Sequence, residues 1–82
     1  MQPNNVEEIM ERVKDIISIR HGEKKVLDKD VAKHLGLSPK RLSFYKTSNK
    51  IPYEELSKFC YYERVSIRWI LFCHGHMKRS ML

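Results

Sequence analysis

The fold of this 82-residue chain is decided by residues 28–47, which read DKDVAKHLGLSPKRLSFYKT. In this stretch Ala32 is followed four positions later by Gly36, and Leu42 and Tyr45 lie six and nine positions after that glycine. A helix-turn-helix, in which two short helices cross at a steep angle, has this spacing, because the second helix passes close to a small residue of the first. The stretch therefore predicts two helices and the turn between them.

Local signals mark the turn and the start of the second of these helices. Gly36 suits the end of the first, where the backbone often turns left-handed and a side chain would clash. Ser38 is a good N-cap, and Pro39 at the first helical position lacks only an N–H that would be unpaired anyway. Leu42 and Tyr45 then bury the inner face, which leaves the other face for a DNA major groove. The apolar wedge between the two helices is supplied by Val31, Leu35 and Leu37.

The positive charge of the chain is concentrated on the same stretch. The net charge is +6, to which residues 1–27 and 51–73 contribute nothing. Residues 28–50 hold six basic against two acidic side chains, net +4, and Lys78 and Arg79 supply the remaining +2. A basic surface on one element attracts phosphate and releases counterions from DNA. The alternative is a generically basic, solvated surface, which is common in small domains.

Size and composition are typical of one soluble globular domain. Hydrophobic residues make up 41% of the chain, but no apolar run approaches the roughly 20 residues that a membrane span needs. The polar start of the chain lacks a signal-peptide pattern, and two cysteines are too few for a disulfide framework. We therefore expect a cytoplasmic protein with no membrane partner.

The sequence before the motif predicts one long helix. Apolar residues recur at steps of three and four over residues 6–21, and Asn4 or Asn5 can cap the helix that this stripe defines. Residues 26–27, both apolar, are expected to tuck inward in the following connection. Asp28 is the expected cap of the second helix.

The remaining elements are short and all helical. The second and third helices are expected over residues 28–35 and 39–46, with a polar turn over residues 47–50. Pro52 starts a fourth helix, and Ser66 caps a fifth. The predicted fold class is all-α, a compact five-helix bundle with a helix-turn-helix. The DNA-binding domain is expected to span residues 1–75, followed by a flexible basic tail over residues 76–82.

Three segments, in this order, resemble a known family of DNA-binding domains. They read VAKHLGLSPKRLSFYK (residues 31–46), NKIPYEELSKFC (residues 49–60) and VSIRWILFCHG (residues 65–75). The third is similar to a closing segment in which serine, an aliphatic residue, tryptophan, an aliphatic residue and leucine follow one another. The chain thus resembles the lambda-repressor-like domains, and more narrowly the N-terminal helix-turn-helix domain of phage CI-type repressors.

The resemblance implies a sequence-specific regulator of transcription that binds a palindromic operator as a dimer, with its third helix in the major groove. Double-stranded DNA and a second copy of the chain are the partners it implies. The sequence departs from the family at two positions near the expected interface. Asp28 stands where a glutamine often hydrogen-bonds a phosphate, and Phe44 stands where a polar base-reading residue is expected.

We expect the outer face of the third helix to read base edges. Lys40, Ser43, Phe44 and Thr47 recur at i, i+3, i+4 and i+7, which makes one stripe opposite the buried face. Lys40 can donate to guanine, Ser43 can pair with either base type, and Phe44 or the Thr47 methyl can pack on a thymine methyl. The start of the helix also usually reaches the bases. The predicted base-reading residues are therefore Ser38, Pro39, Lys40, Ser43, Phe44 and Thr47.

A second group is expected to hold phosphates, contacts that position a protein without reading sequence. Its members are Arg41, Lys46, Ser48, Asn49 and Lys50. Plainer interpretations stand beside these roles. Phe44 can instead pack on the fourth helix as ordinary core, and Lys40 and Arg41 can be solvated charges. Ser43 can be a neutral surface residue.

Other chemistry has little support in the sequence. Cys60, Cys73, His74 and His76 match no zinc pattern with paired ligands on each side, so no metal site is predicted. No nucleophile, base and orienting group cluster, so we expect neither an enzyme nor a cofactor or small-molecule substrate.

The aromatic residues outside the motif suggest core and interface roles. Trp69 is expected in the core rather than on a platform that stacks single-stranded bases. A dimer patch is expected either on Tyr61, Tyr62 and Phe72 or on the tail, with Met77, Met81 and Leu82. The alternative function is a protein-interaction module, in which the helix-turn-helix scaffold presents exposed aromatics to another regulator.

Overall fold

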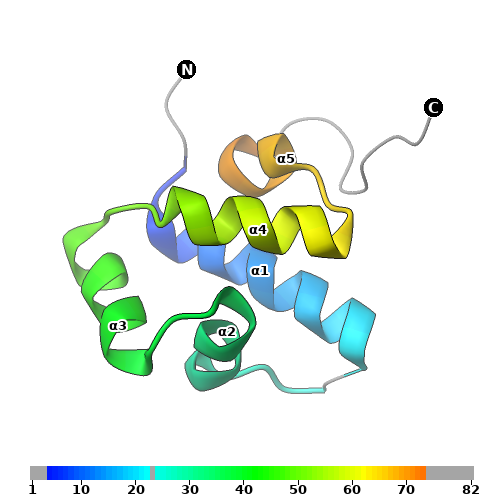
Figure 1. The fold of residues 1–82 in the computed structure, drawn as a ribbon, viewed down its shortest axis with the longest axis horizontal. Coiled ribbons are helices and arrows are strands. Elements are labelled where there is room, and N and C mark those ends of the chain that lie inside the picture. The colour runs from blue at the N-terminus through cyan, green and yellow to red at the C-terminus, as the bar shows by residue number, and fades with distance from the viewer. Residues whose placement is uncertain (1–3, 23, 74–82) are drawn as a thin grey trace.

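The computed structural model describes residues 4–22 and 24–73, and these form five α-helices and no strand (Figure 1). The helices are α1 (Val6–His21), α2 (Asp28–Leu35), α3 (Pro39–Ser48), α4 (Tyr53–Glu63) and α5 (Ile67–Phe72). The all-α class and the five helices predicted from the sequence are confirmed. The predicted tail, residues 76–82, lies outside the described residues.

Helix α1 forms where the apolar stripe predicts it. The Asn5 side chain caps the helix by accepting a hydrogen bond from the Glu8 N–H at 2.9 Å, and Gly22 ends it with a left-handed backbone at φ 69°. The whole apolar stripe is buried, namely Val6, Ile9, Met10, Val13, Ile16 and Ile17. Burial of this stripe against the other helices supplies the largest share of the core, since hydrophobic stabilisation scales with apolar area removed from water.

The start of α2 differs from the sequence prediction in two respects. Leu27, not Asp28, is the N-cap, and the Asp30 carboxylate accepts the Leu27 N–H at 3.0 Å. Asp28 is instead the first helical residue, and its carboxylate pairs with two lysines from neighbouring helices. Leu27 is 42% exposed rather than tucked inward, whereas Val26 is partly buried against the core. The cap differs because the Asp30 side chain reaches back to the N–H of Leu27, while the Asp28 side chain pairs with Lys14 and Lys46.

The turn between α2 and α3 follows the local signals. Gly36 has the left-handed φ of 73°, and the buried Leu37 donates its N–H to the Ala32 carbonyl at 2.8 Å. The Ser38 hydroxyl oxygen then accepts the Arg41 N–H at 3.2 Å, and Pro39 is the first residue of α3. These bonds satisfy backbone groups that a helix end leaves without intrahelical partners.

Helix α3 runs two residues further than predicted, to Ser48. The hydroxyl groups of Thr47 and Ser48 donate to the carbonyls of Ser43 and Phe44, one turn back. These bonds are compatible with a helix, so the polar residues continue α3 instead of leaving it. The helix ends at Asn49, which has a left-handed backbone at φ 54°.

The last two helices close the core. Pro52 precedes α4, and the Ser66 hydroxyl oxygen caps α5 by accepting the Trp69 N–H at 3.3 Å. The predicted cap at Ser66 is therefore confirmed. Trp69, expected in the core, is partly buried against it, and Phe72 is partly buried too. No helix in the part of the chain that the structure describes combines the length and apolarity that crossing a membrane requires.

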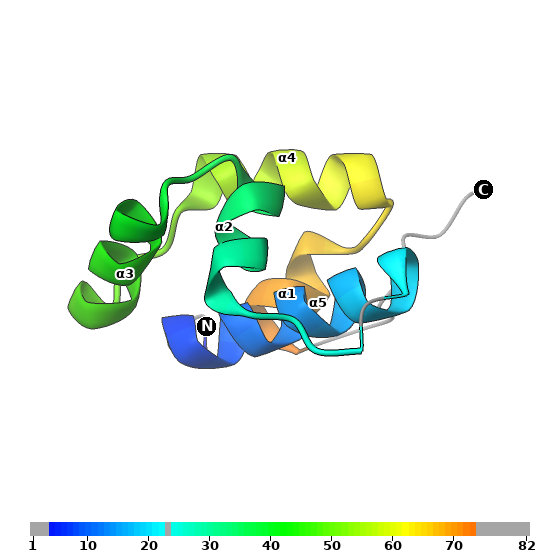
Figure 2. The same ribbon diagram turned by 90° about the horizontal axis from the view of Figure 1, so that it is seen from below.

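The helices are arranged so that α3 lies at one end of the molecule. Figure 1 shows α1 and α4 crossing the middle of the view, with α5 on a different side from α3, and Figure 2 shows α2 between α4 and α1. Polar contacts tie the elements together around the core. The Arg12 Nε donates to the Ile70 carbonyl at 2.8 Å, joining α1 to α5. The rings of His21 and His34 lie with centroids 4.6 Å apart and planes tilted by 43°, which joins α1 to α2.

Candidate nucleic-acid interface

The outer face of α3, formed by Lys40, Ser43, Phe44 and Thr47, is exposed at all four positions. On the opposite side of the same helix Leu42 is only 1% exposed, and it belongs to the core. The structure therefore brings the predicted base-reading side chains of the helix to one accessible surface. Ser38 and Pro39, at the start of the helix, are exposed as well.

Phe44 stands out on this face because it is 57% exposed. The alternative, in which Phe44 packs on α4 as part of the core, is therefore wrong. Its ring meets the Tyr45 ring edge-on with centroids 5.7 Å apart, and the Lys50 ammonium lies 5.9 Å from its centroid. A cation near an aromatic face is attracted by the ring quadrupole. Phe44 is thus held by two neighbours without being covered by them.

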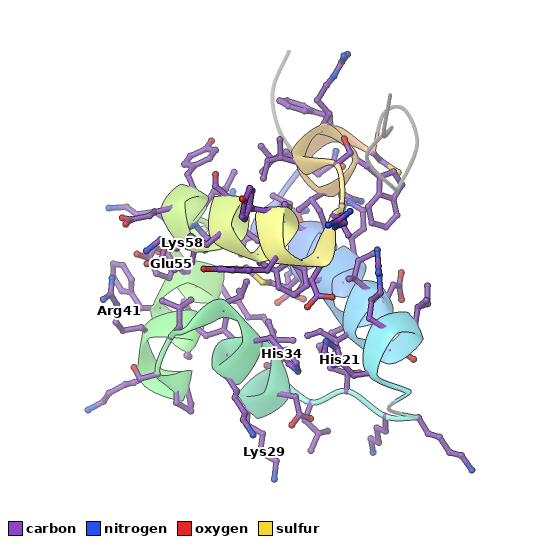
Figure 3. The ribbon with its side chains drawn as sticks, turned by 45° about the vertical axis from the view of Figure 1, so that its right-hand side comes forward. His21, Lys29, His34, Arg41, Glu55 and Lys58 are labelled. Atoms are coloured by element: carbon purple, nitrogen blue, oxygen red, sulfur yellow. The ribbon has the colours of Figure 1, made fainter. Side chains whose placement is uncertain are left out.

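Three cationic side chains surround the outer face of α3 and are exposed. These are Lys40, Arg41 and Lys50. The Arg41 guanidinium donates to the Tyr45 hydroxyl at 3.1 Å and lies 5.9 Å from the Tyr45 ring centroid. Figure 3 shows Arg41 at the α3 end of the molecule, directed away from the other helices. These groups can meet phosphates without any change of fold.

Lys46 lies in a different environment from the other predicted phosphate contacts. Its ammonium is 2.9 Å from an Asp28 carboxylate oxygen and 3.7 Å from a Glu7 oxygen, and its side chain is 20% exposed. Asp28 also pairs with Lys14 at 3.1 Å. We call these four residues the Lys46 cluster. The ammonium that was expected to hold a phosphate is held within the protein, by helices α1 and α2.

The contact between Asp28 and Lys46 changes the pKa values of both groups. The hydrogen bond from Lys46 holds the pKa of the Asp28 carboxyl below its ordinary value, with Lys14 adding to the effect. The same bond raises the pKa of the Lys46 ammonium above its ordinary value. The shifts favour the charged form of each group, so both are charged at neutral pH and pair with one another.

A hollow of about 280 Å³ lies beside the Lys46 cluster. It is lined by Pro39, Leu42, Ser43, Lys46 and Thr47 of α3 together with Glu7 and Asp28. Its wall carries the carboxylates of Glu7 and Asp28 and the Lys46 ammonium that pairs with both, so acidic and basic groups face the same hollow.

The hydroxyl groups at the end of α3 are partly committed to the helix. The Thr47 and Ser48 hydroxyls donate to carbonyls of α3 itself. A contact from Ser48 to a phosphate would have to give up this bond, because a hydroxyl has one hydrogen.

Asn49, the remaining predicted phosphate contact, has a structural task. Its Oδ1 accepts the Val6 N–H at 3.0 Å, which satisfies a first-turn group of α1 from a residue 43 positions away. Its backbone is left-handed, a conformation that asparagine tolerates better than most residues. Asn49 thereby fixes the end of α3 on the start of α1.

We expect Asn49→Ala to lower the free energy of unfolding by about 2 kcal/mol, since it loses a capping bond and strains a left-handed residue. Asn49→Gly is the matched variant, because glycine keeps the backbone conformation and loses only the bond; a loss of about 1 kcal/mol is expected. Urea unfolding of the three proteins checks this. Equal stability of all three would mean that the bond contributes nothing in solution.

We expect Asp28→Asn to lower the free energy of unfolding at pH 7 by about 0.5–1 kcal/mol, the worth of an exposed ion-pair cluster. The folded pKa of Asp28 is below its unfolded value of about 4. Its stabilisation is therefore complete above that unfolded value and is lost as the pH falls through the folded pKa. The difference between the two proteins should shrink in acid, as thermal melts at a series of pH values can show.

The control for this pH dependence is Asp15→Asn, which removes an exposed carboxylate from α1 outside the Lys46 cluster. Its stability should follow that of the parent at every pH. A pH-independent gap between Asp28→Asn and the parent would contradict the assignment of the effect to the Asp28 charge.

The other sequence-predicted groups are dispersed over the molecule. Among residues 4–22 and 24–73 no three potential ligands are placed to hold a metal; Cys60 is buried and Cys73 exposed. Tyr61 and Tyr62, expected in a dimer patch with Phe72, are 66% and 79% exposed at the end of α4. Residues 74–82 lie outside the described part, and with them His74, His76 and the tail residues Met77, Met81 and Leu82.

Comparison of the chain with known protein families, with curated proteins and with solved structures finds no match. The function is therefore inferred from the outer face of α3, the cations around it and the contacts that hold the helix in place.

Proposed function

We propose that this chain is a sequence-specific double-stranded DNA-binding domain that regulates transcription. More narrowly, we propose that it is a phage-type repressor that binds a palindromic operator as a homodimer, with α3 in the major groove. The observation that carries the proposal is the exposed outer face of α3, at one end of the molecule, with three exposed cations around it. A face of this kind combines groups that read bases with groups that hold phosphates.

The local structure of α2 and α3 supports a helix-turn-helix. The two helices are joined by a three-residue connection that starts at a left-handed glycine, Gly36, and buries Leu37. Ala32 is buried at 1% exposure on α2, as a helix crossing close to that residue requires. In DNA-binding motifs of this type the second helix enters the groove, and residues near its N-terminus contact base edges.

Four exposed groups, on α3 and just after it, have different roles in the proposed complex. Lys40 donates to guanine O6 and N7, and Ser43 pairs with a base edge. Arg41 and Lys50 hold phosphates, each releasing a counterion from the DNA. Lys46 and Asn49 are bonded to α2 and α1, and they hold α3 in place instead of contacting the phosphates of the DNA.

The test is a selection of bound duplexes from a random DNA library at near-physiological salt. We expect an inverted repeat with half-sites about 34 Å apart, one helical turn, because two copies of α3 related by a two-fold axis meet one face of the DNA. The affinity for the selected duplex should fall steeply with added salt. Recovery of unenriched sequence bound only at low salt would overturn the proposal.

A protein-interaction module is the second candidate, and the exposure of Tyr61 and Tyr62 at the end of α4 favours it. Their rings meet edge-on with centroids 5.6 Å apart, an apolar pair outside α3. Binding through such a surface depends weakly on salt, whereas DNA binding depends on it strongly. A partner whose affinity survives 0.5 M salt, together with no enrichment of DNA sequence, would favour this candidate.

A further inference from the structure

The chain has three phenylalanines, and they have different environments. Phe59 is buried at 4% exposure and Phe72 is partly buried, whereas Phe44 is exposed in the centre of the outer face of α3. Single exposed aromatic side chains are common on protein surfaces, but this one lies at the centre of the proposed binding face, where it is placed to cover an apolar group of the partner.

The ring of Phe44 contacts two neighbouring side chains. The edge of Tyr45 and the ammonium of Lys50 hold it, at 5.7 Å and 5.9 Å between the relevant centres. A side chain that is already oriented loses less conformational entropy on binding. The ring is thus a preformed apolar contact rather than a flexible one.

Two hydroxyl groups near Phe44 have their hydrogens engaged within α3. The hydroxyl hydrogen of Thr47, three residues further along α3, is used by the Ser43 carbonyl, and that of Ser48 by the Phe44 carbonyl. What the helix presents here is therefore an aromatic ring beside a threonine methyl group. An apolar surface of this kind forms no hydrogen bonds with the donors and acceptors on the base edges of the major groove.

We propose that Phe44 is a specificity-determining residue that reads the C5 methyl group of a pyrimidine in the major groove. This inference rests on the proposed function. The C5 methyl is the apolar group of the major-groove edge of thymine, and 5-methylcytosine carries the same methyl at the same atom. A ring that senses the methyl by apolar contact accepts both bases and discriminates against cytosine and uracil. Methylation of cytosine at this position then strengthens binding.

The experiment uses the full chain and the selected operator. The pyrimidine that Phe44 contacts in the proposed complex is made in four versions. These carry thymine or deoxyuracil opposite adenine, and 5-methylcytosine or cytosine opposite guanine, so that each pair differs by one methyl. We expect each methyl to tighten binding about fourfold per half-site, the worth of one buried methyl-sized group. Equal gains in both pairs assign the reading to the methyl itself, and a gain for thymine alone restricts it to that base.

Three variants identify the reading residue. Phe44→Ala should bind thymine and deoxyuracil duplexes equally, while Phe44→Leu, which keeps an apolar side chain, should retain part of the difference. Thr47→Ser removes the neighbouring methyl and keeps the hydroxyl, and it should leave the preference intact. Because Phe44 is exposed, circular-dichroism melts of the variants should match the parent.

The outcomes separate this inference from the proposed function. Equal affinity of the parent for thymine and deoxyuracil duplexes, with steep salt dependence retained, would overturn the methyl reading and leave the regulator proposal standing. A preference that persists in Phe44→Ala, or that is lost in Thr47→Ser alone, would overturn the role of Phe44. Absence of any selected duplex overturns both.

Discussion

Replacement of Leu42 by alanine is expected to lower the free energy of unfolding by about 3 kcal/mol. Leu42 is 1% exposed and is the buried residue of α3, so the change removes apolar contacts and leaves a cavity under the helix. A domain of this size is stable by only about 5–15 kcal/mol, so the loss is a large fraction of the total. Urea unfolding followed by circular dichroism measures it.

The matched control is Phe44→Ala, which removes a larger side chain from the opposite face of the same helix. Because Phe44 is exposed, its removal should change the free energy of unfolding by no more than about 0.5 kcal/mol. The two variants together test which face of α3 packs on the body of the domain. A larger loss for Phe44→Ala than for Leu42→Ala would place the wrong face inward and would remove the basis of the proposed interface.

The substitution Lys40→Ala is expected to weaken binding to the selected duplex by about 5- to 150-fold, the range of one specific base contact. Lys40 is exposed near the N-terminus of α3, the end that reaches base edges in helix-turn-helix proteins. The loss should be largest for the selected sequence and small for random duplexes. Titration by fluorescence anisotropy at fixed salt checks the result, and a melt should show an unchanged fold.

Arg41→Ala should behave differently from Lys40→Ala, because a phosphate contact carries no sequence information. It should weaken binding to all duplexes alike and reduce the slope of affinity against salt by about one unit. Arg68→Ala is the matched control, since it removes the same exposed side chain from α5, on a different side of the molecule from α3. Equal effects of the two arginine substitutions would show that total charge, not the α3 surface, determines affinity.

The local features of the fold could be predicted from the sequence because each depends on neighbouring residues. Gly22 and Gly36 end helices through left-handed backbones, and Ser38 and Ser66 cap helices through bonds to N–H groups three residues ahead. The apolar stripe of α1 predicted its buried face for the same reason, since helical periodicity places those residues on one side. The exposed stripe of α3 follows from the same periodicity.

The contacts between distant residues could not be predicted in this way. Lys46 and Asp28 are 18 positions apart, and Asn49 and Val6 are 43 positions apart, so no periodicity relates them. Asp28 pairs with Lys46 and does not cap α2 as predicted. Lys46 and Asn49, both expected to contact phosphates, are instead bonded to other helices of the domain. The exposure of Phe44 likewise depends on where α4 passes, because an aromatic residue on α3 is compatible with either core or surface.

The sequence by itself thus determined the five helices, the caps at Asn5, Ser38 and Ser66 and the buried face of α1, all of which follow from propensity, capping and periodicity within a few turns. Tertiary structure alone decided which positive charges remain available on α3 and just after it. Lys40, Arg41 and Lys50 are exposed, whereas Lys46 is paired. The physical reason is that an ion pair depends on distances in space, and these are fixed only when the apolar faces of α1, α2 and α3 pack together.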